Sequence, residues 1–563
     1  MMRRTKLLAH CICALAMTSM CTTPVMARPP EGPPATTTPI QHVIVLFQEN
    51  VSFDHYFASY PNAANPPSEP QFSAQRGTPT VNGLTGALLT SNPNKNNPAN
   101  VPQINPFLLD RSQASTCDQD HDYGDEQLAF DMGLMDMFPA SVGVGDSAFC
   151  LDQYSYGMGN GINEGYFDGN TVTALWNYAQ NYALSDNFYG TTFGPSTPGV
   201  LNLVAGNTYP ATASAASAKI ANPTGLTGTL TGDTDPTGDV CSSSSTVRMG
   251  GQNIGDLLRA QGLSFASFMG GFDLTITNPN GTTGCNRSSP ATAANDTTNF
   301  PPKPTDMNYT ADYIPHHAFF QYFADTANPT HARPTVPPSE YGMFDAPTDA
   351  ANHNYDTNDF FDALKANNLP AVSFIKAPGN MDGHAGYSDP LLEQQWVVTV
   401  INAVQQSNLW SSTAIIITWD DSDGWYDHVI GPIVNPSAWT QTGFGTTSDR
   451  ENSDQLNGLG KCGNGTPLDG IQGRCGYGPR IPMLVISPFA KQNFVDNTLT
   501  DQSSIIHFIE DNWGLPRIGG GSSDATAGSI ENMFDFSHRE SGGSHVMLLD
   551  PKTGEPLFHH PDF

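Results

Sequence analysis

HVIVLFQENVSFDHYF, residues 42–57, is the stretch around which we expect the rest of the chain to fold. Its first six residues form an almost unbroken apolar run rich in β-branched side chains, which is typical of a strand buried on both faces of a parallel sheet. Polar side chains follow abruptly, beginning with Gln48, Glu49 and Asn50. Ligands of open α/β sheets bind at the carboxyl ends of strands, so Glu49 and Asn50 are candidates to hold a divalent cation. From this stretch alone, a loop with incidental polar residues is an equal alternative.

Further apolar runs alternate along the chain with segments of helical periodicity. Strands are predicted at residues 264–268, 369–375, 413–419 and 481–487. Helices are predicted at residues 125–138, 171–182, 253–259, 358–367, 391–409 and 501–513. Strands that alternate with helices indicate an α/β fold, with a mostly parallel sheet and helices on both faces.

The first 40 residues differ in character from the rest of the chain. Residues 1–27 combine a basic start, an apolar middle and small residues near their end, so we expect them to be a removed export signal. Residues 28–40 are proline-rich and are expected to form an extended arm. Residues 41–563 are expected to form a single domain. Its long polar insertions are predicted near residues 61–110, 208–248, 276–310 and 430–478.

Cysteine usage agrees with export. Three of the nine cysteines lie in the predicted signal, and an even set of six follows it. Their grouping along the sequence suggests the pairs Cys117–Cys150, Cys241–Cys285 and Cys462–Cys475. Metal binding by these cysteines is the weaker alternative, because no CxxC spacing occurs among them.

The chain is strongly acidic, with a formal net charge of −31. Such a surface repels nucleic acids and anionic lipids, so neither is expected as a steady partner. After the signal, no segment approaches the roughly 18 consecutive apolar residues of a membrane helix, so no stable membrane insertion is expected. An anionic substrate would need positive charge at its binding site, and a metal ion with histidines is the obvious source. Nothing in the sequence indicates an oligomeric state.

Ser196 lies where a turn meets a predicted helix. Gly194-Pro195 makes the turn, either Ser196 or Thr197 can cap the helix, and Pro198 suits its first turn. The unpaired N–H groups and the positive end of the helix dipole favour both a serine alkoxide and an incoming phosphate. A hydroxyl in this position is more often an ordinary helix cap, so the case for a nucleophile depends on the other motifs.

Two adjacent carboxylates, Asp420 and Asp421, follow the strand predicted at residues 413–419. Because like charges repel, a positive group is expected beside them, and metal binding is favoured over a capped turn. Four histidines also lie near the ends of predicted elements: His121, His316, His317 and His384. Adjacent histidines point in different directions on a regular element, so one of the pair can serve a site while the other packs.

These polar groups come from distant segments that should all end at the same edge of the sheet. Three carboxylates and an amide make a hard, oxygen-rich cation site without the thiolates of structural zinc. A serine beside such a cation can lose its proton and attack phosphorus, while a histidine protonates the leaving oxygen. The set therefore predicts a metal-dependent reaction at a phosphate ester.

Three motifs carry a family resemblance: residues 42–57, Gly-Pro-Ser-Thr-Pro at 194–198, and Trp-Asp-Asp at 419–421 followed by Asp427-His428. Together they resemble the bacterial phosphoesterase family, which includes secreted acid phosphatases of the acid phosphatase A type and phosphatidylcholine-preferring phospholipases C. The resemblance runs from about residue 40 to about residue 515. It implies an alkaline-phosphatase-like sheet core and a catalytic domain spanning 41–563.

The resemblance also implies roles for individual residues. Those that look like metal ligands are Glu49, Asn50, Asp420 and Asp421. Ser196 looks like the nucleophile, which also touches the metal. The four histidines, His121, His316, His317 and His384, look like the lining of the phosphate pocket, and which of them is the general acid stays open. Oxygen ligands favour calcium, magnesium or manganese as the single divalent cation, and leave zinc and iron open.

The choice of substrate depends on a departure from the family pattern. Many phospholipase members continue after the nucleophile with Pro-Asn-Arg, whereas this chain has Pro198-Gly199-Val200. We therefore expect hydrolysis of small phosphomonoesters over cleavage of phospholipids. An acidic optimum is expected if pocket histidines must be protonated to bind phosphate. The alternatives are a phospholipase C, which acts on a phospholipid, and a non-catalytic exported binding protein.

Overall fold

The predicted strand at the start of residues 42–57 is a central strand of the main sheet. β1 (His42–Gln48) pairs in parallel with β15 (Val372–Lys376) on one side and with β16 (Thr413–Trp419) on the other. Every residue of β1 after His42 is buried, as the apolar run predicts. The chain then turns into the short helix α1 (Phe53–Phe57), whose N-cap Ser52 accepts a hydrogen bond from the His55 N–H.

The computed structural model describes residues 35–96, 103–143, 155–215, 219–242, 245–291, 309–340, 349–440, 451–537 and 545–557. The predicted export signal and most of the predicted arm lie outside these residues. Thr36–Phe563 cluster as one compact unit. Within the described ranges, no helix is both long and apolar enough to cross a membrane.

The main sheet has eight strands in the order β14-β11-β15-β1-β16-β17-β4-β18. The strands not yet introduced are β4 (Ala183–Ser185), β11 (Phe265–Met269), β14 (Asn354–Asp356), β17 (Met483–Ile486) and β18 (Phe494–Asp496). All pairings are parallel except those of β17, which runs antiparallel to both of its neighbours. The mostly parallel sheet is therefore confirmed, and the strands predicted from apolar runs are all present.

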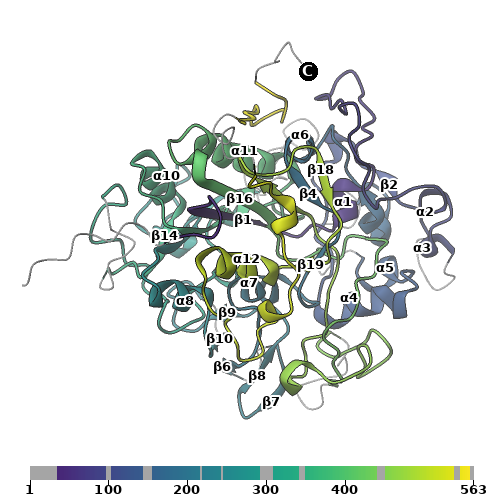
Figure 1. Ribbon diagram of the computed structural model, residues 1–563. Helices are drawn as coiled ribbons and strands as arrows, with labels where there is room; N and C mark the ends of the chain where they lie inside the picture. Colours follow the sequence, from purple (N-terminus) through teal and green to yellow (C-terminus); the bar gives the residue numbers. More distant parts are fainter. Residues whose placement is uncertain are drawn as a thin grey trace, which may run out of the picture. The chain divides into compact units, whose positions relative to one another are not determined.

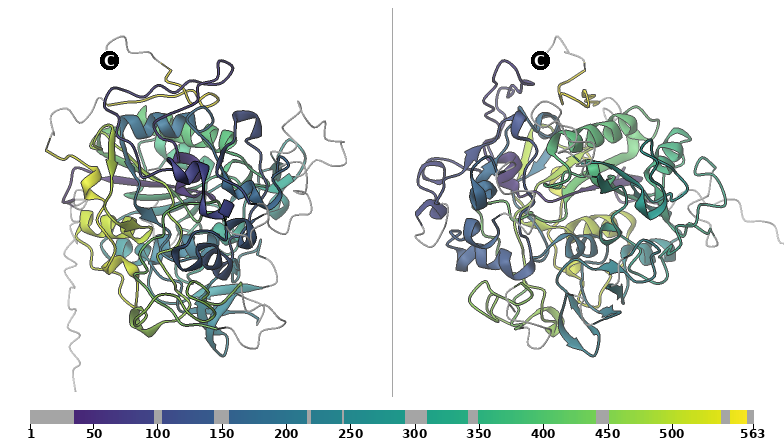
Figure 2. Two further views of the ribbon diagram at one scale, coloured as in Figure 1. Left: turned by 90° about the vertical axis from the view of Figure 1, so that its right-hand side faces the viewer. Right: turned by 180° about the vertical axis from the view of Figure 1, so that it is seen from behind.

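Helices cover both faces of this sheet, as predicted (Figure 1). One face carries α6 (Thr173–Asn181), α10 (Thr357–Lys365) and α11 (Pro390–Gln405). The other carries α7 (Ser196–Ala205), α8 (Ile254–Ala260) and α12 (Ser503–Trp513), and the view from behind shows the same two layers (Figure 2). The α/β class with a covered sheet is thus confirmed.

The long insertions contain small strands as well as loops. In the second insertion, five strands form a separate sheet in the order β7-β8-β6-β10-β9. They are β6 (Ala211–Ala213), β7 (Ile220–Thr224), β8 (Thr227–Leu230), β9 (Asp235–Pro236) and β10 (Thr246–Met249). Two-stranded pairs are formed by β2 (Phe107–Leu108) with β3 (Gly165–Tyr166), β5 (Phe188–Tyr189) with β19 (Thr500–Asp501), and β12 (Ser288–Pro290) with β13 (Tyr309–Ala311). The first insertion carries the short helices α2 (Ala87–Thr90) and α3 (Pro93–Asn96).

The single helix predicted at residues 125–138 is wrong. The structure has α4 (Tyr123–Phe130) and α5 (Phe138–Ser141), separated by left-handed backbone at Asp131 (φ 36°) and Met132 (φ 57°). The apolar residues of this segment do not share one buried face, since Met132 is 60% exposed. Phe130 instead packs against Phe138 across the break.

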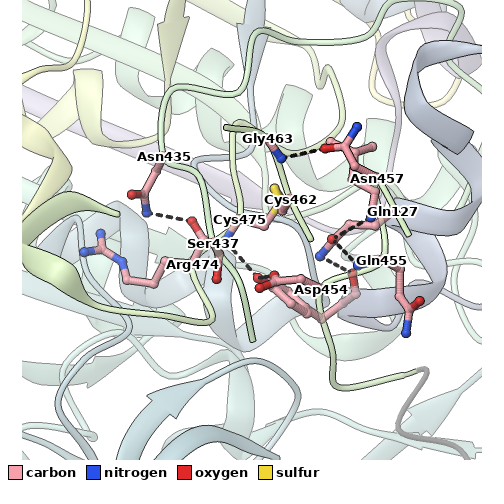
Figure 3. The surroundings of a disulfide bond; sticks show 12 residues. Gln127, Asn435, Ser437, Asp454, Gln455, Asn457, Cys462, Gly463, Arg474 and Cys475 are labelled. Carbon is pink, nitrogen blue, oxygen red and sulfur yellow. Dashed lines mark hydrogen bonds between the residues drawn. A yellow bond between two sulfur atoms is a disulfide. The ribbon is translucent and has the colours of Figure 1, made fainter. Parts of the chain in front are cut away.

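Two of the three predicted disulfides are confirmed: Cys241–Cys285 and Cys462–Cys475. The third pairing involves Cys150, which lies outside the described residues. Around Cys462–Cys475, the fourth insertion is fastened to α4, because the Gln455 N–H donates to Gln127 Oε1 at 2.8 Å (Figure 3). This connection holds the insertion against the helix that carries Glu126, a residue of the candidate site.

Candidate active site

The ends of β1 and β16 lie side by side, because the two strands pair in register from His42 with Thr413 to Gln48 with Trp419. The next residues of each strand therefore meet at one edge of the sheet. Asn50 has a left-handed backbone (φ 59°), a conformation that asparagine tolerates, and its N–H donates to Asp420 Oδ1 at 3.1 Å.

Ser196 is the first residue of α7 and does not cap it. The N-cap is Pro195, which makes no side-chain cap, so the prediction that Ser196 or Thr197 caps the helix is wrong. The capping acceptor is Asp233, whose Oδ1 accepts from the Thr197 N–H at 2.9 Å. The Ser196 hydroxyl points instead to carboxylates, 3.2 Å from Glu49 Oε2 and 3.3 Å from Asp421 Oδ2.

The amide of Asn50 places its oxygen among the same carboxylates. Asn50 Oδ1 lies 2.6 Å from Glu49 Oε2 and 3.0 Å from Asp420 Oδ1, and its nitrogen lies 3.0 Å from His384 Nε2. Turning the amide over would let its nitrogen donate to both carboxylates. A cation among these oxygens would favour the orientation with the oxygen inward. His384 suits that orientation, because its Nδ1 lies 2.6 Å from the Ala385 carbonyl oxygen and donates, so Nε2 of the neutral ring accepts from Asn50. A charged His121, whose Nε2 lies 3.3 Å from the same amide nitrogen, favours the reversed amide when no cation is bound.

The second oxygen of each carboxylate is held by the protein. Glu49 Oε1 contacts the Lys376 ammonium and lies 3.1 Å from His317 Nδ1. Asp420 Oδ2 lies 3.3 Å from Lys376 Nζ, and Asp421 Oδ1 accepts from the Asp423 N–H at 2.7 Å. One oxygen of each carboxylate therefore remains for the cluster.

Five oxygens thus face one another in a buried place. They are Glu49 Oε2, Asn50 Oδ1, Asp420 Oδ1, Asp421 Oδ2 and Ser196 Oγ. Close contacts between acceptors are unfavourable unless a positive charge lies among them, and hard divalent cations take such oxygen sets. The residues present therefore fit the divalent cation that the sequence predicts.

Burial and mutual repulsion perturb these carboxylates. Burial raises the pKa of Glu49 well above its usual value, Asp420 raises it further, and Lys376 opposes both. Burial also raises the pKa of Asp421, with His121 opposing the shift. A bound cation would reverse this balance, because its charge favours the ionised carboxylates.

Two of the four predicted histidines are held as cations. Burial would lower the pKa of His121, but Asp421, Asp423 and Asp118 together raise it well above its usual value. Its Nε2 lies 3.3 Å from Asn50 Nδ2 and its Nδ1 lies 3.5 Å from Asp423 Oδ1. Both contacts place His121 beside the oxygen cluster.

His316 is held as a cation in the same way. Burial would lower its pKa, but Asp233 and Asp235 raise it. His316 Nδ1 lies 3.6 Å from Asp235 Oδ1, and Nε2 lies 4.0 Å from Asp233 Oδ2. Its side chain is 29% exposed, so this cation is reachable from solvent.

The other two histidines are held neutral. Burial lowers the pKa of His317 well below its usual value, and the neighbouring His316 and Lys376 lower it further. Burial also lowers the pKa of His384. His317 packs edge-on against His316, and His384 packs edge-on against His121, with ring centroids 4.5 Å and 5.9 Å apart. Each neutral ring thus lies beside a cationic one.

The structure brings all nine predicted site residues into one network of contacts, and their chemical roles stay predictions. Residues that the sequence reasoning missed are Lys376, Asp423, Asp233 and Glu126. Lys376 directly follows the strand predicted at residues 369–375, and that position could have signalled it. Glu126 joins the turn before Ser196 to the loop after Asp421, since it accepts from the Gly194 N–H at 2.9 Å and from the Ser422 hydroxyl at 2.6 Å. Burial raises the pKa of Glu126 to about 7.

Gly199 lets α7 lie against the end of β16. A Cβ at this position would overlap the Asp420 carbonyl oxygen. Gly199→Ala is therefore expected to cost about 1–3 kcal/mol of stability through overpacking. It should also lower turnover by about tenfold or more, because a displacement of 1 Å in a catalytic group can cost about 10²-fold. Thermal unfolding and kcat measure the two effects, and wild-type values for both would contradict the close approach.

The fold and this geometry define an α/β protein that gathers carboxylates and a serine hydroxyl at the carboxyl edge of its sheet. Residues 40–516 match the model of the Phosphoesterase family. The chain belongs to this family, as the motifs predict.

Similarity to phospholipases C supports the same class of protein. A non-hemolytic phospholipase C of Pseudomonas aeruginosa is 34% identical over 185 residues, 31% of this chain and 25% of that protein. Phospholipase C B of Mycobacterium tuberculosis is 27% identical over 208 residues, 36% of this chain and 34% of that protein. The chain thus matches only a quarter to a third of the length of these relatives.

A solved structure from Vibrio parahaemolyticus, described as a protein in the alkaline phosphatase superfamily, is also similar. It covers 62% of each chain at 12% identity, with a TM-score of 0.27. A likeness at this score carries no argument about fold or function, so the α/β class rests on the sheet and helices described above.

Proposed function

We propose that the chain is a metal-dependent phosphoric ester hydrolase with Ser196 as its nucleophile. The observation that carries the proposal is the Ser196 hydroxyl, 3.2 Å from Glu49 Oε2 and 3.3 Å from Asp421 Oδ2 at the start of α7. Membership of the Phosphoesterase family and the similarity to named phospholipases C support the same reaction class.

The residues of the site suit a two-step transfer through a phosphorylated serine. A bound divalent cation would favour the alkoxide of Ser196 and offset the charge of the phosphoryl group. Ser196 Oγ attacks phosphorus, the ester oxygen leaves, and water then hydrolyses the phosphoserine. The positive end of the α7 dipole favours the phosphoryl oxygens in both steps, while the Thr197 N–H in its first turn stays with Asp233.

The charge of each histidine decides its proposed role. In our proposal the cations of His121 and His316 hold the anionic phosphoryl group, and the more exposed His316 is the candidate to protonate the leaving oxygen. The neutral rings of His317 and His384 orient Glu49 and Asn50 through contacts of 3.1 Å and 3.0 Å. Orientation of metal ligands by hydrogen-bonded neighbours is usual in metal sites.

Within this class we favour small phosphomonoesters and an acidic optimum. Gly199 supports this preference: α7 packs on Asp420 so closely that the asparagine of the Pro-Asn-Arg pattern does not fit the same packing. A phospholipase C is the second candidate, because the relatives named above carry that name. A non-catalytic exported binding protein is the third.

One assay separates the three candidates. The purified chain, loaded with Mn²⁺, Mg²⁺ or Ca²⁺ in turn, is given a soluble chromogenic phosphomonoester and, separately, phosphatidylcholine vesicles. We expect kcat/KM for the monoester to exceed that for the phospholipid by at least about 10²-fold, in the range typical of active-site discrimination. The reverse ratio identifies a phospholipase C, and no turnover with either substrate supports a binding protein.

The pH dependence tests the role of His316. A cationic His316 is present below its pKa, so kcat/KM should fall as the pH rises through that value. Because the carboxylate of Asp233 raises this pKa, Asp233→Asn should move the fall to lower pH. The amide introduced by this substitution would keep an oxygen for the Thr197 N–H, so the cap of α7 survives. Identical pH–rate profiles for the two proteins would remove His316 from phosphate binding.

Several finer points belong to the proposal. The metal is a single divalent cation, and calcium, magnesium or manganese suit its oxygen ligands best. Residues 41–563 act as one catalytic domain, and residues 1–27 direct the chain to the periplasm or beyond. Metal analysis of the purified protein and N-terminal sequencing of the mature form test these points directly.

A further inference from the structure

Lys376 is a buried cation that the proposed chemistry does not use. It is the last residue of β15, next to β1 in the sheet, and its side chain is only 1% exposed. Lys376 ends β15, while Glu49 and Asp420 directly follow the neighbouring strands β1 and β16, so a cation lies beside two carboxylates.

The contacts of Lys376 account for all of its donors. Nζ contacts Glu49 Oε1, lies 3.3 Å from Asp420 Oδ2, and lies 3.4 Å from the Gln48 carbonyl oxygen. A lysine ammonium has three N–H donors. Nζ also lies 4.9 Å from the centre of the Phe47 ring, which covers it on one side. No donor is left for a substrate, so Lys376 acts through the carboxylates.

The position of Lys376 decides which carboxylate oxygens face the cluster. Glu49 and Asp420 each turn one oxygen to Lys376 and the other to the five-oxygen cluster. A carboxylate held in this way offers one oxygen to a cation and cannot swing round to offer both. Lys376 therefore sets single-oxygen coordination by two proposed ligands.

Lys376 also contacts one member of a second group of potential ligands. Glu49, His317 and Asp382 each offer an atom within 4.8 Å of the others, close enough to hold a metal ion. Glu49 Oε1 is the oxygen that the Lys376 ammonium contacts. An ammonium and a divalent cation would repel each other at this distance, so both cannot occupy the group.

We infer that Lys376 is a positioning residue that takes the place of a second metal ion, so that the site holds one divalent cation and not two. The inference rests on the proposed metal-dependent function. It concerns the number of cations, which is measured without any substrate, so its failure and the failure of the proposed hydrolysis can be told apart.

Two substitutions separate the charge of Lys376 from its volume. Lys376→Met removes the ammonium and keeps most of the bulk, whereas Lys376→Ala removes both. Equilibrium dialysis against Mn²⁺ followed by metal analysis should give one ion per chain for the wild type and for Lys376→Met, and two for Lys376→Ala. Lys491→Met is the control, because the Lys491 ammonium contacts Asn532 outside this site.

Turnover provides the second readout. Lys376→Met should lower kcat by at least about tenfold, because its carboxylates are free to turn, and added Mn²⁺ should not restore it. Lys376→Ala should regain part of its kcat as Mn²⁺ rises, in step with the second bound ion. One ion in Lys376→Ala would overturn the inference. So would two ions in the wild-type protein, a result that stands even if both variants fail to fold.

Discussion

Replacement of Ser196 by alanine is expected to lower turnover of a phosphomonoester by about 10⁴-fold or more, the scale seen when a nucleophile is removed. In our proposal the hydroxyl is the group that forms the covalent bond to phosphorus. Its removal leaves the carboxylates in place, so folding and Mn²⁺ binding should persist. Steady-state kinetics, thermal unfolding and metal analysis of the same preparation measure the three properties.

Ser196→Thr is the matched control for this loss. Threonine keeps a hydroxyl at the same position on a branched side chain, so Ser196→Thr should retain measurable turnover. Thr197→Ala tests the neighbouring hydroxyl, which donates to Asp233 at 3.0 Å and has no part in the proposed attack. If Ser196→Ala kept near-normal rates, or if Thr197→Ala lost as much as Ser196→Ala, the nucleophile would be wrongly assigned.

The central strands could be predicted because their residues fit a buried strand better than any other element of secondary structure. The runs in β1 and β16 are mostly apolar and rich in β-branched residues, and both strands are buried on both faces. Their parallel pairing then fixes where the next residues go, which is why Glu49 and Asp420 could be placed together from sequence. Cys462–Cys475 follows from the same locality, since both cysteines lie within the fourth insertion. Cys241–Cys285 instead joins the second insertion to the third, and its prediction rests on the order of the cysteines along the chain.

The errors arise where tertiary contacts override a local pattern. Residues 125–138 have helical spacing, yet left-handed backbone at Asp131 and Met132 divides them and lets Phe130 meet Phe138. Ser196 looked like a cap because capping is the common role of such a hydroxyl. The structure supplies the cap from Asp233, 36 residues further along the chain, and no local signal could show that.

The residues that the sequence did not reveal were missed for a different reason. Lys376 and Glu126 act by joining elements, and each makes contacts to residues far away in sequence. A motif search finds residues that recur beside the chemistry, whereas a linking residue is recognised only when its partners are known. The structure therefore adds mainly linking residues such as Lys376 and Glu126, whereas the residues that they hold in place could be predicted from the sequence.

Removal of the metal ion is expected to abolish turnover and to destabilise the protein. Without a cation, the oxygens of Glu49, Asn50 and Asp420 meet in a buried place, where repulsion is poorly screened. A ligand that binds only the folded state at a hundred times its Kd stabilises that state by about 2.7 kcal/mol. Chelation should therefore lower the Tm, and Mn²⁺, Mg²⁺ or Ca²⁺ should restore both properties to differing degrees.

Asp421→Asn tests whether the change in Tm on chelation comes from metal binding at the oxygen cluster. The new amide would keep an oxygen for the Asp423 N–H but would bind a cation more weakly, because it lacks the negative charge. The Tm of this variant should therefore respond less to chelator and to added Mn²⁺ than the wild-type Tm does. In the wild type, the Tm and kcat measured across a Mn²⁺ titration should rise together, since one binding event controls both. A chelated wild-type protein that kept its Tm and its turnover would show that the oxygen cluster holds no catalytic metal. Hydrolysis would then have to depend on Ser196 and the histidines alone.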